Sequence, residues 1–377
     1  MRPYEGCVGG RLLADVGVYS SPSSRVTVEH NGARLEELPA GAPMAPVDPH
    51  WSATRGALEA LNDAHLPGAA LTRADLGRLD EIPVVVLPNV TRMDREEADA
   101  IRAYVAGGGR LYASARTSLL PTDGAPQDDF LLADLFGCHF SGEAPEAISY
   151  LRPASEPLSS SLGPLAYVAV GEPSELERWY RSGPAPEVLV VVADEDAEVL
   201  MTVTLPYGGG RGTRDDQDWA SIHSAPPWED TARPAVVRHR FGAGEVIYSS
   251  VDIESAGGRQ AGPSRRLFVD LIRLLLGRPP AFEADAHPNA WTTVFHEPEK
   301  SRFRLSFLNA PPDSPPLPVP LIRFRLAVPE GHRFTSLRRM PDGEELEFSL
   351  DADGGMEAEV RDLALFEMLS AHYGEDV

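Results

Sequence analysis

The chain has 377 residues, of which 42% are hydrophobic and 24% are charged, a composition typical of globular domains and unlike that of a disordered chain. Its 57 acidic and 34 basic side chains give a formal net charge of −23, which repels phosphate backbones and anionic lipid and argues against nucleic acid and membranes as partners. The sequence has no apolar run near the ~20 residues that span a bilayer and no secretory signal, so we expect a cytoplasmic protein.

Two residue types restrict the chemistry further. Lys300 is the only lysine, which argues against a phosphate-binding P-loop and against Schiff-base catalysis, because both depend on a lysine. Cys7 and Cys138 are the only cysteines, too few for a disulfide framework or a cysteine-built zinc site. The sequence therefore predicts neither a cofactor nor a metal centre.

The first part of the chain, from residue 14 to about 137, alternates short apolar runs with helical periodicity. This alternation predicts βαβ units around a parallel sheet. The clearest helix starts after Thr91 or Asp94, which are both good N-caps, and ends at three glycines, 107–109. We expect strands at 14–19, 84–87 and 110–115, helices near 57–64 and 95–106, and a short helix capped by Asp128 or Asp129 and ended by Gly137.

The middle of the chain, between about 138 and 250, has short β-like stretches at 188–192 and 199–205 among segments rich in Pro and Gly. Residues 206–230 have the composition of a long surface loop. A hairpin is expected across the turn at 242–244, and apolar residues from Leu267 to Leu275 recur at helical spacing. A domain boundary follows near residue 280.

Beyond that boundary the apolar residues alternate with a period of two. Phe303, Leu305 and Phe307 show the alternation, as do the segments 322–328 and 346–350. This period indicates strands with one buried face. The sequence therefore predicts an α/β domain over 1–280, flavodoxin-like or amidotransferase-like, followed by a small antiparallel β-sandwich over 281–377.

The carboxyl ends of parallel strands are where such an α/β domain binds ligands. Ser114 lies at one of these ends, at the turn where an amidotransferase or α/β hydrolase carries its nucleophile, but Ala113 and Ala115 replace the usual flanking glycines. A serine nucleophile also needs a histidine oriented by an acid, and His223 and His239 stand at no recognisable spacing. Ser114 is the candidate catalytic residue, against the simpler interpretation of a strand-end serine bonded to backbone.

Other polar residues at the same edge are candidate ligand contacts, namely Asn89, Arg116 and Thr117. Trp219 and Trp228 lie in the predicted loop and are of a type that stacks on sugar faces.

Three further groups have simpler interpretations. His139 beside Cys138 lacks further metal ligands at a suitable spacing, which favours a partly buried cysteine and a surface histidine. Paired carboxylates serve glycoside cleavage when they face each other across a sugar. Asp128 and Asp129 are adjacent in sequence and are better explained as helix caps, and the acidic residues 215–218 as a solvated loop.

Two segments, LPNVTRMDREEADAIRAYVAGGGRLYASARTSLL (87–120) and QDDFLLADLFG (127–137), resemble the trimerisation domain of family 42 β-galactosidases. They also resemble a related group of hypothetical glycosyl hydrolases, in which a sugar-hydrolase barrel precedes this domain. ADVGVYSS (14–21) and FGAGEVIYSSVDIE (241–254) fit the same pattern. The resemblance implies a class I glutamine amidotransferase-like fold without the nucleophile, in agreement with the missing cysteine at Ser114.

In proteins of that kind the catalytic glutamates lie in an N-terminal (β/α)8 barrel of ~250 residues. Only thirteen residues precede the first expected strand, so the resemblance brings no catalytic glutamate to this sequence. We expect a non-catalytic assembly or scaffold region, a barrel-less homologue or a C-terminal fragment, that forms a homo-oligomer. The resemblance favours a homotrimer, with a carbohydrate or a glycoside hydrolase barrel as a further partner.

Two alternatives stay open. One is a hydrolase or amidotransferase-like enzyme that uses Ser114. The other is a carbohydrate-binding module that uses Trp219 and Trp228 or the face of the sandwich.

Overall fold

The computed structural model describes residues 4, 9–25, 49–122, 127–146, 148–154, 158, 167–171, 188–207, 226–255, 261–311 and 315–375. The chain divides into two compact units, which we call the sheet unit (17–57 and 70–277) and the sandwich unit (1–16, 58–69 and 278–377). Each unit therefore combines separate stretches of the sequence. The expected domains, 1–280 and 281–377, stay a prediction.

The sheet unit contains a mixed nine-stranded sheet with the order β3-β2-β4-β5-β12-β11-β10-β7-β8. β5 (Arg110–Ser114) pairs in parallel with β4 (Val84–Leu87) and with β12 (Gly244–Ser249). The pairings from β12 through β11 (Pro227–Phe241) to β8 are antiparallel. The predicted parallel arrangement therefore holds for β4, β5 and β12, and the hairpin expected across 242–244 is confirmed. The other strands are β2 (Val16–Tyr19), β3 (Gly68–Leu71), β7 (Ile148–Pro153), β8 (Val168–Gly171) and β10 (Glu198–Pro206), and a separate pair is formed by β6 (Cys138–Glu143) and β9 (Leu189–Ala193).

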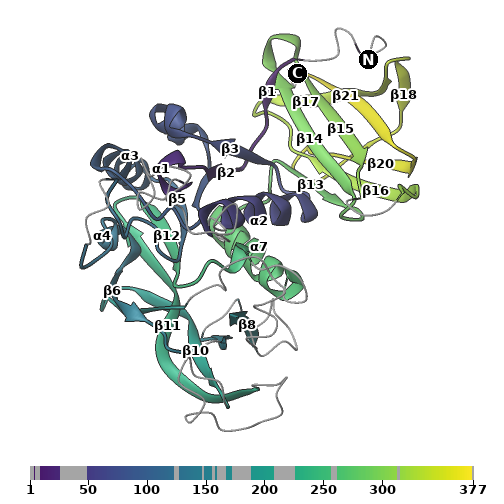
Figure 1. Cartoon of the computed structure of the whole chain (residues 1–377). Coiled ribbons are helices and arrows are strands. Elements are labelled where there is room, and N and C mark those ends of the chain that lie inside the picture. Colours follow the sequence, from purple (N-terminus) through teal and green to yellow (C-terminus); the bar gives the residue numbers. More distant parts are fainter. Residues whose placement is uncertain are drawn as a thin grey trace, which may run out of the picture. The chain divides into compact units, whose positions relative to one another are not determined.

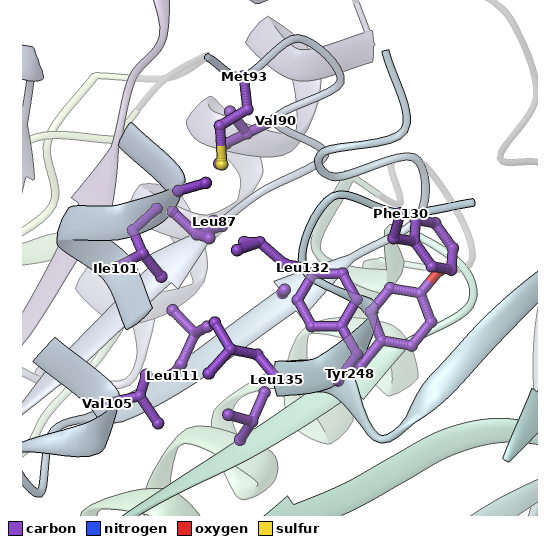
Figure 2. Close-up of a cluster of buried hydrophobic side chains, with 14 of the residues drawn as sticks. Leu87, Val90, Met93, Ile101, Val105, Leu111, Phe130, Leu132, Leu135 and Tyr248 are labelled. Carbon is purple, nitrogen blue, oxygen red and sulfur yellow. The ribbon is translucent and has the colours of Figure 1, made fainter. Parts of the chain in front are cut away.

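Helices α3 (Arg95–Ala106) and α7 (Ala261–Leu276) cover opposite faces of this sheet (Figure 1). Successive residues of a strand point to opposite faces. Leu111 of β5 belongs to the hydrophobic cluster that contains Ile101 of α3, as Figure 2 shows. The next residue of β5, Tyr112, points to the other face, where its ring packs edge-on against Phe268 of α7, with 5.2 Å between the ring centroids. β5 is therefore covered on both sides, which explains why Leu111, Tyr112 and Ala113 are all buried.

Helix α3 follows its sequence signals closely. Asp94 is the N-cap and accepts a hydrogen bond from the backbone N–H of Glu97, whose side chain accepts one from the N–H of Asp94 in return. The predicted stripe of Ala98, Ile101 and Val105 is buried. The helix ends where Gly108 adopts a φ of +109°, which a residue with a side chain rarely adopts.

The caps predicted at Asp128 and Asp129 are wrong. Helix α4 (Ala133–Phe136) begins after Leu132, and Gly137 ends it in the left-handed region as expected. The Oδ1 atom of Asp129 instead accepts hydrogen bonds from the backbone N–H groups of Phe130 and Phe140. The carboxylate thus joins two chain segments, because one donor belongs to the next residue along the chain and the other to the strand β6. The remaining helices among the described residues are α1 (Pro22–Arg25), α2 (Pro49–Asp63) and the 3-10 helices η4 (Arg73–Glu81), η5 (Ile253–Ser255) and η7 (Pro298–Lys300).

The sandwich unit has a six-stranded sheet, β1-β14-β15-β21-β17-β18, and a four-stranded sheet, β13-β16-β20-β19. All their described pairings are antiparallel. The alternation predicted at Phe303, Leu305 and Phe307 is confirmed, since all three are buried in one core with Phe324 and Leu326. The strands are β1 (Arg11–Leu12), β13 (Phe282–Asp285), β14 (Ala290–Glu297), β15 (Arg302–Asn309), β16 (Val319–Leu326), β17 (His332–Met340), β18 (Glu344–Leu346), β19 (Ser349–Leu350), β20 (Met356–Leu363) and β21 (Phe366–Glu375).

Candidate functional site

The carboxyl ends of β4, β5 and β12 lie together, because the three strands are parallel and in register. Ser114, the last residue of β5, is completely buried there. Its hydroxyl donates to Oε1 of Glu254 at 2.5 Å and accepts from the backbone N–H of Asn89 at 2.9 Å. Both the proton and a lone pair of the candidate nucleophile are therefore already engaged within the protein.

Glu254, in η5 after β12, is the acidic partner that the sequence analysis missed. It is fully buried and also accepts a hydrogen bond from the hydroxyl of Tyr112 at 2.9 Å. Burial, followed by the neighbouring carboxylate of Asp252, raises the pKa of Glu254 to about 8. A raised pKa disfavours the ionised form of Glu254, and only that form could take the proton of Ser114 as a general base.

The predicted ligand contacts Asn89 and Thr117 lie beside Ser114 and are also engaged. The amide Nδ2 of Asn89 donates to Oδ2 of Asp252 at 3.1 Å, and its Oδ1 accepts from the backbone N–H of Arg116 at 3.2 Å. The hydroxyl of Thr117 lies 2.7 Å from the carbonyl of Ser114 and accepts from the N–H of Val90 at 3.0 Å. These bonds join the ends of neighbouring strands. The third predicted contact, the guanidinium of Arg116, pairs with Glu143 on β6.

The turn after β5 places its left-handed residue at Ala115, with a φ of +47°. A nucleophile elbow presents its reactive side chain from a sharp, strained turn of this kind at the end of a strand. Here that side chain is a methyl group, whereas the hydroxyl of Ser114 lies one residue earlier, within the strand. The backbone thus keeps a strained turn, but the residue at its apex cannot act as a nucleophile.

Among the described residues, no histidine hydrogen-bonds to Ser114. His50 of α2 lies at the same edge, where Nδ1 is 2.7 Å from the carbonyl of Pro88 and Nε2 accepts from the N–H of Ser21 at 2.9 Å. His239 is buried, with Nδ1 3.0 Å from the carbonyl of Leu135. His223 lies outside the described residues. The serine-histidine-acid arrangement is therefore not formed in the part of the chain that the structure describes.

Cys138 and His139 have the surroundings that the simpler interpretation expects. Cys138 is a free, fully buried thiol, and burial raises its pKa. His139 is exposed, with Nδ1 2.5 Å from Oδ2 of Asp129 and Nε2 3.3 Å from Oδ1 of Asp194. The hydrogen bond to Asp129, more than any other contact, raises the pKa of His139. Within the described ranges, no group of three or more His, Cys, Asp or Glu side chains is arranged to hold a metal ion.

Of the two candidate tryptophans, Trp228 lies on β11 rather than in a loop, and Trp219 lies outside the described residues. Trp228 is 69% exposed and packs edge-on against Tyr207, with 4.8 Å between the ring centroids. The acidic residues 215–218 also lie outside the described residues. Across the described helices, none combines the length and apolar character needed to cross a bilayer.

The missed residues Glu254 and Asp252 have a recognisable signal in retrospect. Both follow the strand VIYS, and residues that follow a parallel strand gather at the edge where ligands bind. The hairpin interpretation of β11 and β12 was correct, but it did not indicate that β12 also pairs with β5. His50 had no comparable signal, because it lies at the start of a helix.

Comparison with known proteins gives a fold relationship and no sequence family. No family model matches the chain, and no curated protein does. The α-L-fucosidase isoenzyme 2 from Paenibacillus thiaminolyticus matches with a TM-score of 0.73 and 19% identity, over 99% of this chain and 51% of that one. The β-galactosidase from Bacillus circulans sp. alkalophilus matches with a TM-score of 0.62 and 14% identity, over 97% of this chain and 42% of that one.

A third solved structure is Gan42B, a GH42 β-galactosidase from G. stearothermophilus, in a catalytic-mutant form. It has a TM-score of 0.60 and 11% identity over 98% of this chain and 42% of that one. At such identities the similarity shows the fold alone. The chain spans about half the length of the glycoside hydrolases that it matches, and the match includes both of its units.

Proposed function

We propose that the chain is a cytoplasmic, non-catalytic assembly region related to glycoside hydrolases of carbohydrate metabolism. In this proposal it holds together copies of itself, as a homotrimer, or binds a catalytic glycoside hydrolase barrel. The observation that carries the proposal is the pairing at the carboxyl edge of the sheet, where the Ser114 hydroxyl donates to Glu254 and accepts from the backbone N–H of Asn89, whose side chain donates to Asp252. Groups that are engaged in this way stabilise strand ends and are not free for substrate.

The turn at Ala115 supports the same conclusion. A left-handed residue at the end of a parallel strand, with a methyl side chain in place of a nucleophile, supports a class I glutamine amidotransferase-like domain that lacks the catalytic residue. The similarity in fold to glycoside hydrolases supports a role in carbohydrate metabolism, because it extends over 97–99% of the chain.

The assembly role is tested by measuring the mass of the purified chain. Size-exclusion chromatography with light scattering, at 1 to 50 μM, is expected to give three times the mass of one chain. If the chain stays monomeric over this range, titration with a separately expressed glycoside hydrolase barrel tests whether it binds such a barrel instead. A chain that is monomeric and binds no barrel would end the proposal.

The non-catalytic role is tested with p-nitrophenyl α-L-fucoside, p-nitrophenyl β-D-galactoside and p-nitrophenyl acetate. We expect no turnover above buffer, and the same result for Ser114→Ala. A turnover that Ser114→Ala abolishes, in a variant that retains the native circular dichroism spectrum, would instead establish a serine-dependent enzyme.

Carbohydrate binding is a second candidate function, and the exposed indole of Trp228 beside Tyr207 favours it. Aromatic rings stack on the apolar faces of sugars. Calorimetric titration with galactosides and fucosides is expected to give heat that Trp228→Ala removes. Trp51→Ala, at an exposed tryptophan outside both candidate surfaces, is the matched control, and an absence of heat with every sugar excludes this function.

A further inference from the structure

Basic residues gather on one face of the six-stranded sheet in the sandwich unit. Residues that pair across antiparallel strands share a face, and the register of β14, β15, β21 and β17 puts eight residues in two neighbouring rows. The opposite face of these strands carries the core residues Leu305, Leu369 and Leu337. The two rows therefore lie on the face away from the core. One row is Phe295, Arg304, Ser370 and Arg338, and the next is Glu297, Arg302, His372 and Ser336.

We call Lys300, Arg302, Arg304, Arg338 and His372 the basic face. On this face one carboxylate, that of Glu297, accepts hydrogen bonds from three cationic side chains. Glu297 accepts from Lys300 Nζ at 2.6 Å, from Arg302 Nε at 3.0 Å and from Arg304 Nε at 3.3 Å. These donors, Arg302 above all, lower the pKa of Glu297 to about 2. Three positive charges around one negative charge leave a local excess of positive charge.

Arg304 is the residue in which this excess is buried. Its side chain is 4% exposed, and its Nη1 has no hydrogen-bond acceptor. A buried N–H group without an acceptor loses its hydration and gains nothing in exchange, and this cost is larger for a charged group. The guanidinium of Arg304 is therefore paired with Glu297 through Nε but has a buried donor, Nη1, without an acceptor.

The residues around Arg304 extend the same pattern. Arg338 lies across Ser370 from Arg304 in the register, and its only described acidic contact is the exposed Glu345 at 3.2 Å. The ring of His372 lies 3.0 Å from the Ser370 hydroxyl. Burial first, and then the positive charges of Arg302, Arg338 and Arg304, lower the pKa of His372. The positive charges of three arginines are therefore felt at His372, which lies beside Ser370.

We propose that the basic face is a binding site for an oxyanion, a carboxylate or phosphate group, held by Arg304 and Arg338 with His372 beside it. Guanidinium groups present paired N–H donors that match the oxygens of both groups. The chain carries a net charge of −23, so its overall field repels anions. Selective binding at this face therefore depends on short-range hydrogen bonds, which sets it apart from general ionic attraction. The site is independent of the assembly role proposed above.

The test is a titration of the full chain with inorganic phosphate and with acetate, at constant ionic strength maintained with chloride. We expect saturable heat with at least one of the two, and the one that binds identifies the class of ligand. Arg304→Gln and Arg338→Gln are each expected to weaken binding roughly tenfold, the effect of losing one charge-assisted hydrogen bond. Arg323→Gln, at an exposed arginine of the four-stranded sheet, is the matched control and should bind as the wild type does.

A second readout follows the imidazole of His372 by NMR. A bound oxyanion supplies negative charge beside the ring, so its pKa is expected to rise on saturation. If Arg304→Gln fails to fold, Arg338→Gln carries the test, because the side chain of Arg338 is 48% exposed. The proposal is overturned if neither anion gives saturable binding, if Arg338→Gln binds as tightly as the wild type, or if the pKa of His372 does not move.

Discussion

The carboxyl edge of the sheet unit and the basic face of the sandwich unit differ in how far their buried polar groups are hydrogen-bonded. At the carboxyl edge, the hydroxyls of Ser114 and Tyr112 both donate to Glu254. On the basic face, Arg304 is equally buried but keeps a donor without an acceptor. A network whose polar groups pair with one another stabilises the fold, whereas a network that is short of one charge is suited to a ligand.

The largest effect is expected from Glu254→Ala at the carboxyl edge. The substitution removes the acceptor of Ser114 and Tyr112 together and leaves a cavity, so the free energy of unfolding should fall by about 4 kcal/mol. Urea denaturation followed by circular dichroism measures it. Glu195→Ala, at an exposed glutamate of the same unit, should cost less than about 0.5 kcal/mol. A similar loss in both variants would contradict the pairing.

A smaller effect is expected from Glu297→Gln on the basic face. The amide keeps an acceptor oxygen but loses the negative charge that faces Lys300, Arg302 and Arg304, so stability should fall by about 2 kcal/mol. Because the carboxylate of Glu297 no longer competes with phosphate for these cations, phosphate should bind several-fold more tightly. Urea denaturation and calorimetric titration measure the two quantities, with Glu359→Gln as the control at an exposed ion pair. Weaker phosphate binding in Glu297→Gln would count against the oxyanion site.

The two carboxylates also predict opposite responses to pH. The pKa of Glu254 is raised from 4.5 to about 8, so between these values the folded state binds more protons than the unfolded state. The contribution of Glu254 to stability is therefore complete below pH 4.5 and is lost as the pH rises through 8. The pKa of Glu297 is lowered to about 2, so its contribution is present above pH 4.5 and is lost as the pH falls towards 2.

A comparison of the wild type with Glu254→Gln measures how the contribution of Glu254 to stability changes with pH. An amide does not titrate, so the difference in free energy of unfolding between the wild type and this variant should decrease from pH 5 to pH 8, by about 3 kcal/mol. Urea denaturation at four pH values measures it. A difference that stays constant over this range would show that Glu254 does not change its protonation there.

Local signals in the sequence were sufficient for the elements and for much of the core. The cap at Asp94, the stripe of Ala98, Ile101 and Val105, and the period of two around Leu305 each depend on residues within one element. Propensity and periodicity act over such distances, and these predictions are confirmed. Asp129 shows the limit, because its cap-like sequence position was overridden by donors on a neighbouring strand.

The pairings that define both sites depend on contacts between distant residues. Ser114 and Glu254 are 140 positions apart and meet because β12 pairs in parallel with β5. Arg304 and Arg338 share a row because both pair with Ser370 of β21. Alternation indicated strands whose charged residues face outward, but no local pattern specifies the register of three strands, and a shift of one residue would separate these side chains.

The smallest effect is expected from Glu345→Gln, at the exposed end of the basic face. The pair of Glu345 with Arg338 is open to solvent on both sides, and such pairs contribute less than about 0.5 kcal/mol. Stability should hardly change, but Arg338 loses its only described acidic contact, so phosphate binding should strengthen by roughly twofold, a gain that 0.5 M chloride screens. Calorimetric titration at two chloride concentrations measures this change. Because stability and affinity separate in this variant, an equal loss of both would show that the face is structural, as the carboxyl edge is.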